Sequence, residues 1–184
     1  LATPCPVLIA APVAFLGGLS RAAKAGIIIK GGAVIEQLAR VRSAAFDKTG
    51  TLTKGQPVLV DVRARNGFDA DDVLQLAASA EQYSSHVLAE GIRTAASARG
   101  LTIDRASEAR EVATNGVTAT IGGRTVVVGK PAYIASLAPD TERADLEAGQ
   151  AAAYVAVDGR FAGVLVLADD PRQESRSVMT WLRD

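Results

Sequence analysis

The residue that opens the chemistry of this chain is Asp47, a carboxylate that follows the short apolar run 44–46. The run predicts a buried strand that delivers Asp47 to the carboxyl edge of a sheet, where open α/β sheets place their sites. Residues 48–53 then form a turn with one glycine and three hydroxyl side chains. Because carboxylates form covalent phosphoryl intermediates, Asp47 is a candidate nucleophile towards phosphate. For a bare Asp-x-Thr-Gly, an ordinary surface aspartate in a turn is the alternative.

The residues beside Asp47 suit a phosphate site. Lys48 can offset phosphate charge, and Thr49 and Thr51 offer hydroxyl groups. The turn at Gly50 offers backbone N–H groups to phosphate oxygens. A magnesium ion is expected to bridge the carboxylate and the phosphate. We therefore predict Asp47, Lys48 and Thr49 as catalytic residues, with Asp47 and Thr49 at the magnesium ion.

The whole run from Phe46 to Thr53, Phe-Asp-Lys-Thr-Gly-Thr-Leu-Thr, resembles the phosphorylation signature of P-type ATPases. Soluble phosphatases of the same haloacid-dehalogenase-like superfamily carry a second Asp two residues after the nucleophile. That Asp acts as general acid and then as base, and it speeds hydrolysis of the phospho-enzyme. Here the position is Thr49, which cannot do this at neutral pH. The phospho-enzyme is therefore expected to persist, as a pump requires while it changes shape.

Composition narrows the class of protein. The chain of 184 residues has room for one large domain or two small ones. Its 20 Lys and Arg residues equal its 20 Asp and Glu residues, so there is no basic excess of the kind that marks nucleic-acid binding. The single cysteine excludes an intrachain disulfide and favours a reducing compartment. Both ends are expected to be cut, because the chain opens without Met in an apolar segment and stops inside a predicted amphipathic helix.

The first nineteen residues are almost wholly apolar, carry no charge and include Pro4, Pro6 and Pro12. Their length is marginal for a membrane span of about 20 residues. A buried core helix or strand is the alternative, but three prolines argue against either in a soluble protein. Basic residues follow at Arg21 and Lys24, as they do at the cytoplasmic end of a membrane segment. We therefore predict a partial transmembrane helix over residues 1–20, with the rest of the chain in the cytosol.

Within this segment lies Thr3-Pro4-Cys5-Pro6. A thiolate is a soft ligand that suits transition metals, although a single cysteine is often an inert buried residue. The four residues resemble the Cys-Pro-Cys element in the transport helix of heavy-metal P-type ATPases, with Pro6 in place of the second cysteine. The resemblance implies that Cys5 binds the transported ion. It also implies a divalent metal, with nickel, cobalt, iron or zinc favoured over copper.

Residues 81–86 resemble part of the nucleotide-binding domain of the same family. Glu81 and His86 match the Glu and the His-Pro pair that line the ATP adenine pocket there, and Val87 replaces the proline. A single histidine is otherwise more often structural or simply exposed. The resemblance implies that Glu81 and His86 contact the adenine.

A second part of that domain is matched by two glycines. Gly116 matches the second member of a Gly-x-Gly pair that lets the backbone approach the nucleotide, and Thr114 replaces the first. Gly129 matches the glycine of a Val-Gly-Asn element that closes the pocket, with Lys130 in place of the asparagine. The resemblance implies nucleotide binding at Gly116, Gly129 and Lys130, where the lysine would meet phosphate or ribose.

The elements that must position these residues follow from periodicity and turn chemistry. We expect helices over 73–81, 87–99 and 140–148, the first capped by the acidic run 69–72. Strands are expected over 58–62, 112–130, 152–157 and 161–167, with hairpin turns at 122–123 and 158–159. Asp169 and Arg172 match an Asp-x-x-Arg element near the family's hinge, and a helix N-cap by Asp169 is an equal alternative.

Together these features predict an α/β fold. It comprises an incomplete haloacid-dehalogenase-like phosphorylation domain, an inserted α+β nucleotide-binding domain and the N-terminal partial transmembrane helix. The expected divisions are 1–20 for the helix, 21–56 and 168–184 for the phosphorylation domain, and 57–167 for the nucleotide-binding domain. The family's second half of the phosphorylation domain, with its phosphate-contacting lysine and magnesium-holding Gly-Asp-Gly-x-x-Asn-Asp element, is not in this sequence. A fragment of a larger pump is therefore expected, with little ATPase turnover of its own.

The resemblance implies that the whole protein is an ATP-driven transition-metal transporter in a multi-pass membrane location, the plasma membrane of a prokaryote. Its ligands would be ATP, Mg²⁺ and the metal ion, and its partners membrane lipid and the remainder of the pump, with no nucleic acid. Two other functions stay open. One is a soluble phosphatase of the same superfamily. Thr49 and the apolar N-terminal run argue against it. The other is a non-catalytic nucleotide-binding remnant of a pump, suggested by Val87, Thr114 and Lys130.

Overall fold

The computed structural model describes residues 5–112 and 114–183. The chain divides into two compact units, Leu1–Phe46 and Asp47–Asp184. The first unit contains two helices, α1 (Cys5–Lys24) and α2 (Gly32–Leu38). They pack at Gly32, where an added Cβ would lie 2.9 Å from the ring of Phe15. This contact joins the two helices of the unit.

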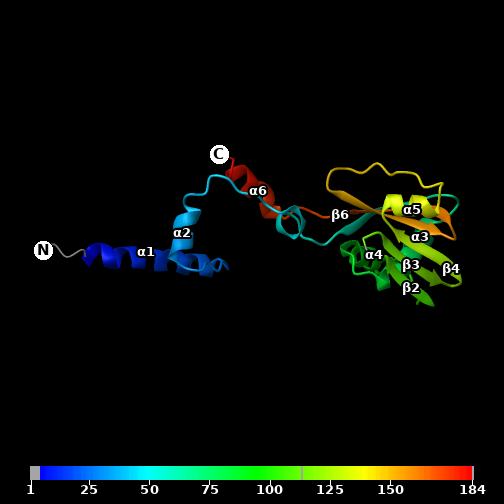
Figure 1. The fold of residues 1–184 in the computed structure, drawn as a ribbon, viewed down its shortest axis with the longest axis horizontal. Coiled ribbons are helices and arrows are strands. Elements are labelled where there is room, and N and C mark those ends of the chain that lie inside the picture. Colours follow the sequence, from blue (N-terminus) through cyan, green and yellow to red (C-terminus); the bar gives the residue numbers. More distant parts are fainter. Residues whose placement is uncertain (1–4, 113, 184) are drawn as a thin grey trace. The chain divides into compact units, whose positions relative to one another are not determined.

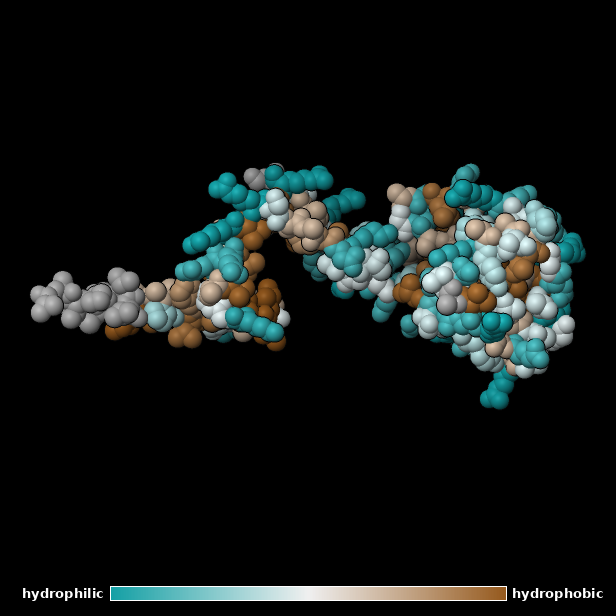
Figure 2. Space-filling model, viewed as in Figure 1, coloured by the Kyte–Doolittle hydropathy of each residue, from teal (hydrophilic) through white to brown (hydrophobic). Residues whose placement is uncertain are grey.

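A helix, α1, is present near the N-terminus, with Arg21 and Lys24 in its last turn. Within residues 5–112 and 114–183, no helix is long and apolar enough to cross a membrane. Figure 2 shows hydrophobic surface on this unit, where Ile9, Val13 and Leu16 are 60–66% exposed.

The strand predicted over 44–46 is also wrong. Residues 41–47 have no regular structure, and Phe46 is 42% exposed. No strand in the described part of the chain pairs with this run. An isolated strand leaves its backbone N–H and C=O groups without partners, so the apolar composition alone does not fix a strand here.

The second unit is built around a six-stranded antiparallel sheet with strand order β1-β6-β5-β4-β3-β2 (Figure 1). Its helices cover both faces of the sheet, and α6 follows after the last strand. The strands are β1 (Val58–Ala64), β2 (Glu108–Val112), β3 (Gly116–Ile121), β4 (Arg124–Gly129), β5 (Gln150–Val157) and β6 (Arg160–Ala168). The helices are α3 (Ala70–Ala80), α4 (Val87–Ala98), α5 (Pro131–Leu137) and α6 (Gln173–Trp181), with short helical turns at Lys48–Leu52 and Glu81–Tyr83.

Local sequence signals explain most of these elements. Gly122 and Gly123 have φ of 57° and 81°, as the tight turn between β3 and β4 requires. Asp158 and Gly159 do the same between β5 and β6, with φ of 50° and 74°. Asp69 caps α3, because its carboxylate accepts from the backbone N–H of Asp71 at 2.8 Å. Both predicted hairpins and the predicted cap are therefore confirmed.

Two clusters of apolar side chains lie on the two faces of the sheet, between the strands and the helices that cover them. Helices α3 and α4 pack on one face, and α5 packs on the other with the segment that follows it. Strands β5 and β6 are buried on both faces over most of their length, which is why they are almost continuously apolar. The first cluster includes Leu74, Ile92, Val117, Val155 and Leu165; the second includes Ile134, Tyr154, Phe161 and Val166.

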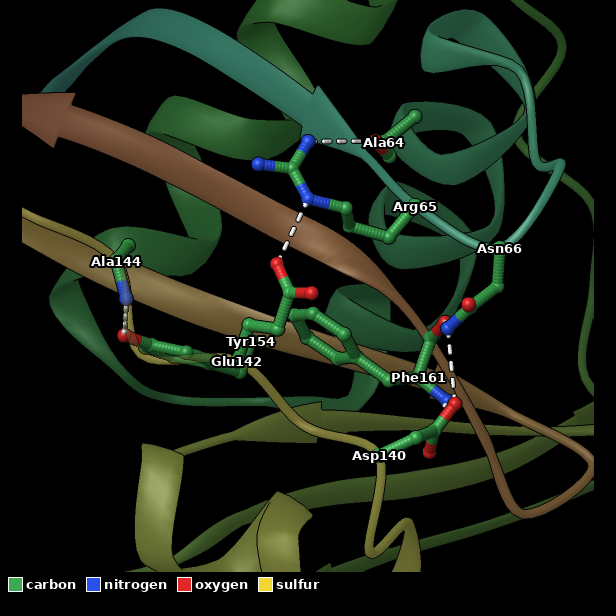
Figure 3. Close-up of polar contacts among 8 residues, drawn as sticks. All are labelled: Ala64, Arg65, Asn66, Asp140, Glu142, Ala144, Tyr154 and Phe161. Carbon is green, nitrogen blue, oxygen red and sulfur yellow. Dashed lines mark hydrogen bonds and ion pairs between the residues drawn. The ribbon is translucent and has the colours of Figure 1, made fainter.

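The helix predicted over 140–148 is wrong, and the helix on this side of the sheet is α5 instead, which begins at Pro131. Residues 141–147 have no regular structure. Figure 3 shows the reason: polar groups of this segment form hydrogen bonds with residues of the sheet. Asp140 accepts from the N–H of Phe161 at 3.2 Å and from the side-chain amide of Asn66 at 2.8 Å. The Tyr154 hydroxyl accepts from the N–H of Ala144 at 2.9 Å.

An ion pair between Arg65 and Glu142, 3.1 Å from nitrogen to oxygen, adds to these contacts (Figure 3). It is largely exposed and contributes little by itself. The bond from the N–H of Phe161 to Asp140 and the bond from the N–H of Ala144 to Tyr154 are partly buried, and Tyr154 and Phe161 belong to the second cluster. Tertiary hydrogen bonds thus outweigh the helical pattern of this segment.

We predict that Leu165→Ala destabilises the 184-residue chain by about 2–5 kcal/mol, because it removes a fully buried side chain from the first cluster. Urea unfolding followed by circular dichroism measures the change. Leu146→Ala makes the same chemical change at a side chain that is 42% exposed, and it should cost less than about 0.5 kcal/mol. Equal losses for the two variants would contradict the assignment of the core.

Candidate functional site

Asp47 is exposed and stands directly before the short helical turn Lys48–Leu52. Two contacts of Thr53 close this turn. Its N–H donates to the carbonyl of Lys48 at 3.0 Å, and its hydroxyl lies 3.1 Å from the same oxygen. Gly50, at φ 80°, turns its N–H towards the hydroxyl of Thr53 at 3.2 Å. That N–H was expected to be free for phosphate and is used inside the turn instead.

The chain that returns from the sheet is tied to this turn. Asp169 accepts from the hydroxyl of Thr53 at 2.5 Å and from the N–H of Gly55 at 3.0 Å. Thr53 also forms a bridge with Pro171. Figure 1 shows the two connecting segments side by side between the sheet and α6. Asp169 therefore joins the segment that leaves the turn to the segment that comes back.

Arg172 and Ser175 extend this connection. The guanidinium of Arg172 donates to the carbonyl of Gly50 at 3.2 Å, and its backbone N–H donates to the carbonyl of Leu52 at 2.9 Å. The hydroxyl of Ser175 donates to the same Leu52 oxygen at 2.7 Å. The alternative account of Asp169 as a helix N-cap is wrong, because the N-cap of α6 is Arg172.

The described residues place few further metal-binding side chains beside the predicted metal ligands. Within 5–112 and 114–183, no group of three or more His, Cys, Asp or Glu side chains is placed to hold a metal ion. Asp47 and Thr49 lie in one exposed turn. Cys5 begins α1, while Thr3 and Pro4 fall outside the described residues. A magnesium ion at Asp47 would therefore need further oxygen ligands from phosphate and water, as Mg²⁺ commonly takes them.

The five residues predicted to bind nucleotide line one cavity of about 80 Å³. They come from the short turn after α3, the start of α4, the first residue of β3, the last residue of β4 and the residue before α5. They are Glu81, His86, Gly116, Gly129 and Lys130. Residues up to 49 positions apart in sequence, from Glu81 to Lys130, thus meet at one place.

The two glycines are required by close backbone approach. A Cβ on Gly116, at φ 155°, would lie 2.1 Å from the carbonyl oxygen of Val128. A Cβ on Gly129 would lie 2.4 Å from the carbonyl oxygen of Asn115. Any side chain at either position would push β3 and β4 apart. Glycine at both positions is therefore required by the packing of the neighbouring backbone.

Glu81 gives the cavity an unsatisfied buried acceptor. The residue is 5% exposed, and its Oε2 has no hydrogen-bond partner among the described residues. Burial raises the pKa of Glu81 above its ordinary value, against the opposing effects of Ser84 and the charge of Arg93, and the charge of Glu111 adds to the rise. A buried polar atom without a partner is costly, which makes Oε2 a natural contact for a ligand donor.

The 80 Å³ volume is smaller than the ~300–1,000 Å³ of typical ligand pockets. The cavity has room for only part of a nucleotide, with the rest across its mouth. A larger hollow of about 770 Å³ lies between α4 and the segment entering β1, and it shares Ser84 and His86 with the smaller one. Gly116, Gly129 and Glu81 do not line this larger hollow. The smaller cavity is therefore the one that contains all of the residues expected to bind nucleotide.

Sequence reasoning missed one charged lining residue, Glu111, on the edge strand β2. A glutamate on a short strand with exposed neighbours is an ordinary surface residue by pattern. Only its place beside Ser85 and the cavity distinguishes it.

Comparisons with known proteins agree with this arrangement. A sequence model of the haloacid dehalogenase-like hydrolases matches residues 41–184. The zinc-transporting ATPase of Synechocystis is 35% identical over 175 residues, which cover 95% of this chain and 24% of that protein. The cadmium, zinc and cobalt-transporting ATPase of Bacillus subtilis is 32% identical over 183 residues, 100% of this chain and 26% of that protein. The chain spans about a quarter of the length of these curated relatives.

Among solved structures, a zinc-transporting PIB-type ATPase in its E2.Pi state superposes with a TM-score of 0.71 at 33% identity. That match covers 98% of this chain and 30% of the other.

A further relative by sequence is a probable copper-exporting P-type ATPase of Mycobacterium tuberculosis, which is 37% identical over 190 residues, 97% of this chain and 24% of that protein. The chain therefore belongs to the haloacid dehalogenase-like hydrolases, and within them it corresponds to a segment of the heavy-metal P-type ATPases.

Proposed function

We propose that this chain is the part of a heavy-metal-transporting P-type ATPase that accepts phosphate at Asp47 and binds ATP on the antiparallel sheet. One observation carries the proposal: the five residues expected to bind nucleotide, drawn from separate elements, line a single cavity. In this proposal residues 57–167 are the nucleotide-binding domain, 21–56 and 168–184 belong to the phosphorylation domain, and 1–20 belong to a transport helix.

In the proposed reaction, a carboxylate oxygen of Asp47 attacks the γ-phosphorus of ATP. The bond from that phosphorus to the β,γ-bridging oxygen breaks, and ADP leaves with the bonding electrons. Lys48 offsets the charge of the transferred group, and a magnesium ion at Asp47 and Thr49 would neutralise the phosphate oxygens. Because Thr49 has no acid to activate water, the aspartyl-phosphate outlives the transfer.

The cavity fits an adenine nucleotide on chemical grounds. The free Oε2 of Glu81 is an acceptor for the exocyclic amine of adenine, and His86 lies at the same wall. Gly116 and Gly129 line the same cavity and place no side chain in it. Lys130 is exposed and lines the cavity from the start of α5, where its ammonium group would meet the phosphates that extend from the mouth.

The transported metal is proposed from Cys5 alone. A single thiolate with Pro6 in place of a second cysteine favours a divalent ion such as nickel, cobalt, iron or zinc over copper. The relatives are named for zinc, copper, or cadmium with zinc and cobalt, so their names do not choose among these ions. The multi-pass location in a prokaryotic plasma membrane, the lipid contacts and the remainder of the pump belong to the same proposal.

We predict that Asp47→Asn abolishes acid-stable phosphorylation of the full-length pump by labelled ATP, because a carboxamide does not form the acyl phosphate that a carboxylate forms. Asp72→Asn, which makes the same change in the first turn of α3, should leave labelling unaltered. Phosphate label that survives acid in the Asp47 variant would remove the assignment of the nucleophile.

We predict that Lys130→Met weakens binding of ATP to the 184-residue chain about threefold to tenfold while leaving adenosine binding nearly unchanged, since a charge-assisted contact to phosphate is lost. Calorimetric titration measures both ligands. Arg124→Met, at the exposed start of β4, which ends one residue before Lys130, is the control and should bind ATP as the parent does. An equal loss for ATP and adenosine would place Lys130 away from the phosphates.

We predict that Glu81 makes the folded chain less stable as pH rises. Burial raises the pKa of Glu81 from 4.5, so just above 4.5 the folded state keeps a proton that the unfolded state releases. The associated stability is fully present below 4.5 and is lost as pH rises through the folded pKa. Urea unfolding at stepped pH should show this slope. Glu81→Gln should flatten it, Glu108→Gln should keep it, and an unchanged slope in Glu81→Gln would count against the buried carboxyl.

A further inference from the structure

The segment 84–86, which carries His86 to the cavity, is held mostly by contacts within itself. The N–H of Ser84 donates to the carbonyl of Glu81 at 3.3 Å, and the N–H of His86 donates to the hydroxyl of Ser84 at 3.1 Å. The Nδ1 of His86 accepts from the N–H of Leu88 at 3.3 Å, which makes His86 the N-cap of α4. These bonds shape the turn, but they do not attach it to the opposite wall of the cavity.

One contact does attach it. Glu111, on β2, accepts from the backbone N–H of Ser85 and from its hydroxyl, both at 3.2 Å to Oε1. The hydroxyl also lies 3.4 Å from Oε2. Among the hydrogen bonds of the described residues, this contact joins segment 84–86 to the sheet. Ser85 and Glu111 are 26 residues apart in the sequence. A carboxylate that accepts from both groups of one residue fixes its place more firmly than a single bond would.

The sequence of the segment leaves it in need of such a tie. Val87 follows His86, and valine does not lock φ as proline does. Both serines have small side chains without apolar packing, and Ser85 is exposed. The position of segment 84–86 relative to β2 therefore depends on what holds Ser85.

We propose that Glu111 is a positioning residue of the nucleotide pocket: by binding Ser85 it holds segment 84–86 against β2 and so sets His86 at the wall of the cavity. The proposal rests on the proposed function, because the cavity must bind a nucleotide for the position of His86 to matter. Glu111 acts through Ser85 and His86, and the part of its side chain that lines the cavity need not touch the ligand.

The test is calorimetric titration of ATP into the 184-residue chain. Glu111→Ala should weaken ATP binding about fivefold, since it removes the acceptors of Ser85. Glu111→Gln keeps a side-chain oxygen for the Ser85 N–H, and it should stay within about twofold of the parent. Glu108→Ala, on the same strand and also exposed, should bind as the parent does. Ser85→Ala, which removes the hydroxyl donor from the other side of the tie, should reproduce part of the Glu111→Ala loss.

Two readouts separate positioning from direct contact. Amide hydrogen exchange at Ser85 should speed up in Glu111→Ala and stay slow in Glu111→Gln. In a double-mutant cycle, Glu111→Ala should cost little further affinity once His86→Ala is present, because its effect passes through His86.

The outcomes also separate this proposal from the proposed function. If the parent chain does not bind ATP, the nucleotide site itself fails. If the parent binds and Glu111→Ala stays within twofold of it, the positioning role is overturned. The same holds if Glu111→Gln loses as much as Glu111→Ala, or if the two losses add fully in the cycle, since either result puts the charge of Glu111 directly on the ligand.

Discussion

The structure of the second unit depends on the carboxylate of Asp169. Its two oxygens bind the hydroxyl of Thr53 and the N–H of Gly55, so a residue that follows the last strand holds two residues that follow the turn at Asp47. The bridge between Thr53 and Pro171 lies beside this contact. With it, the turn that carries Asp47 and the sheet that carries the cavity have a defined connection, to which Arg172 and Ser175 add further hydrogen bonds.

The cavity combines closely packed backbone with a buried carboxyl group. Gly116 and Gly129 sit opposite one another in the β3–β4 register, and each excludes any Cβ because a carbonyl oxygen occupies that space. Glu81 reaches the same place from the turn after α3, buried and with one oxygen free. An apolar sheet would not retain a buried carboxyl for stability, since its desolvation is unfavourable. Its presence at the cavity is what the proposed nucleotide site accounts for.

Much of this was accessible from sequence, for identifiable physical reasons. Hairpin turns at Gly122-Gly123 and Asp158-Gly159 and the cap at Asp69 depend on a few adjacent residues, so local pattern suffices. The helix expected over 140–148 failed because Asp140 and Tyr154 bond across the sheet, which pattern does not reveal. The strand expected over 44–46 failed because a strand needs neighbours. Resemblance supplied the five cavity residues, whereas Glu111 was invisible because only the fold places it beside Ser85.

The pairing of the first and last strands has a mechanical consequence. Val58 lies opposite Ala168 in the register of β1 and β6, so the polypeptide enters and leaves the sheet at a single point, through two adjoining antiparallel chains. A double-stranded joint of this kind resists twisting about its own length, yet it bends readily across it. Any movement of the sheet relative to the turn at Asp47 would therefore be concentrated in these two adjoining chains.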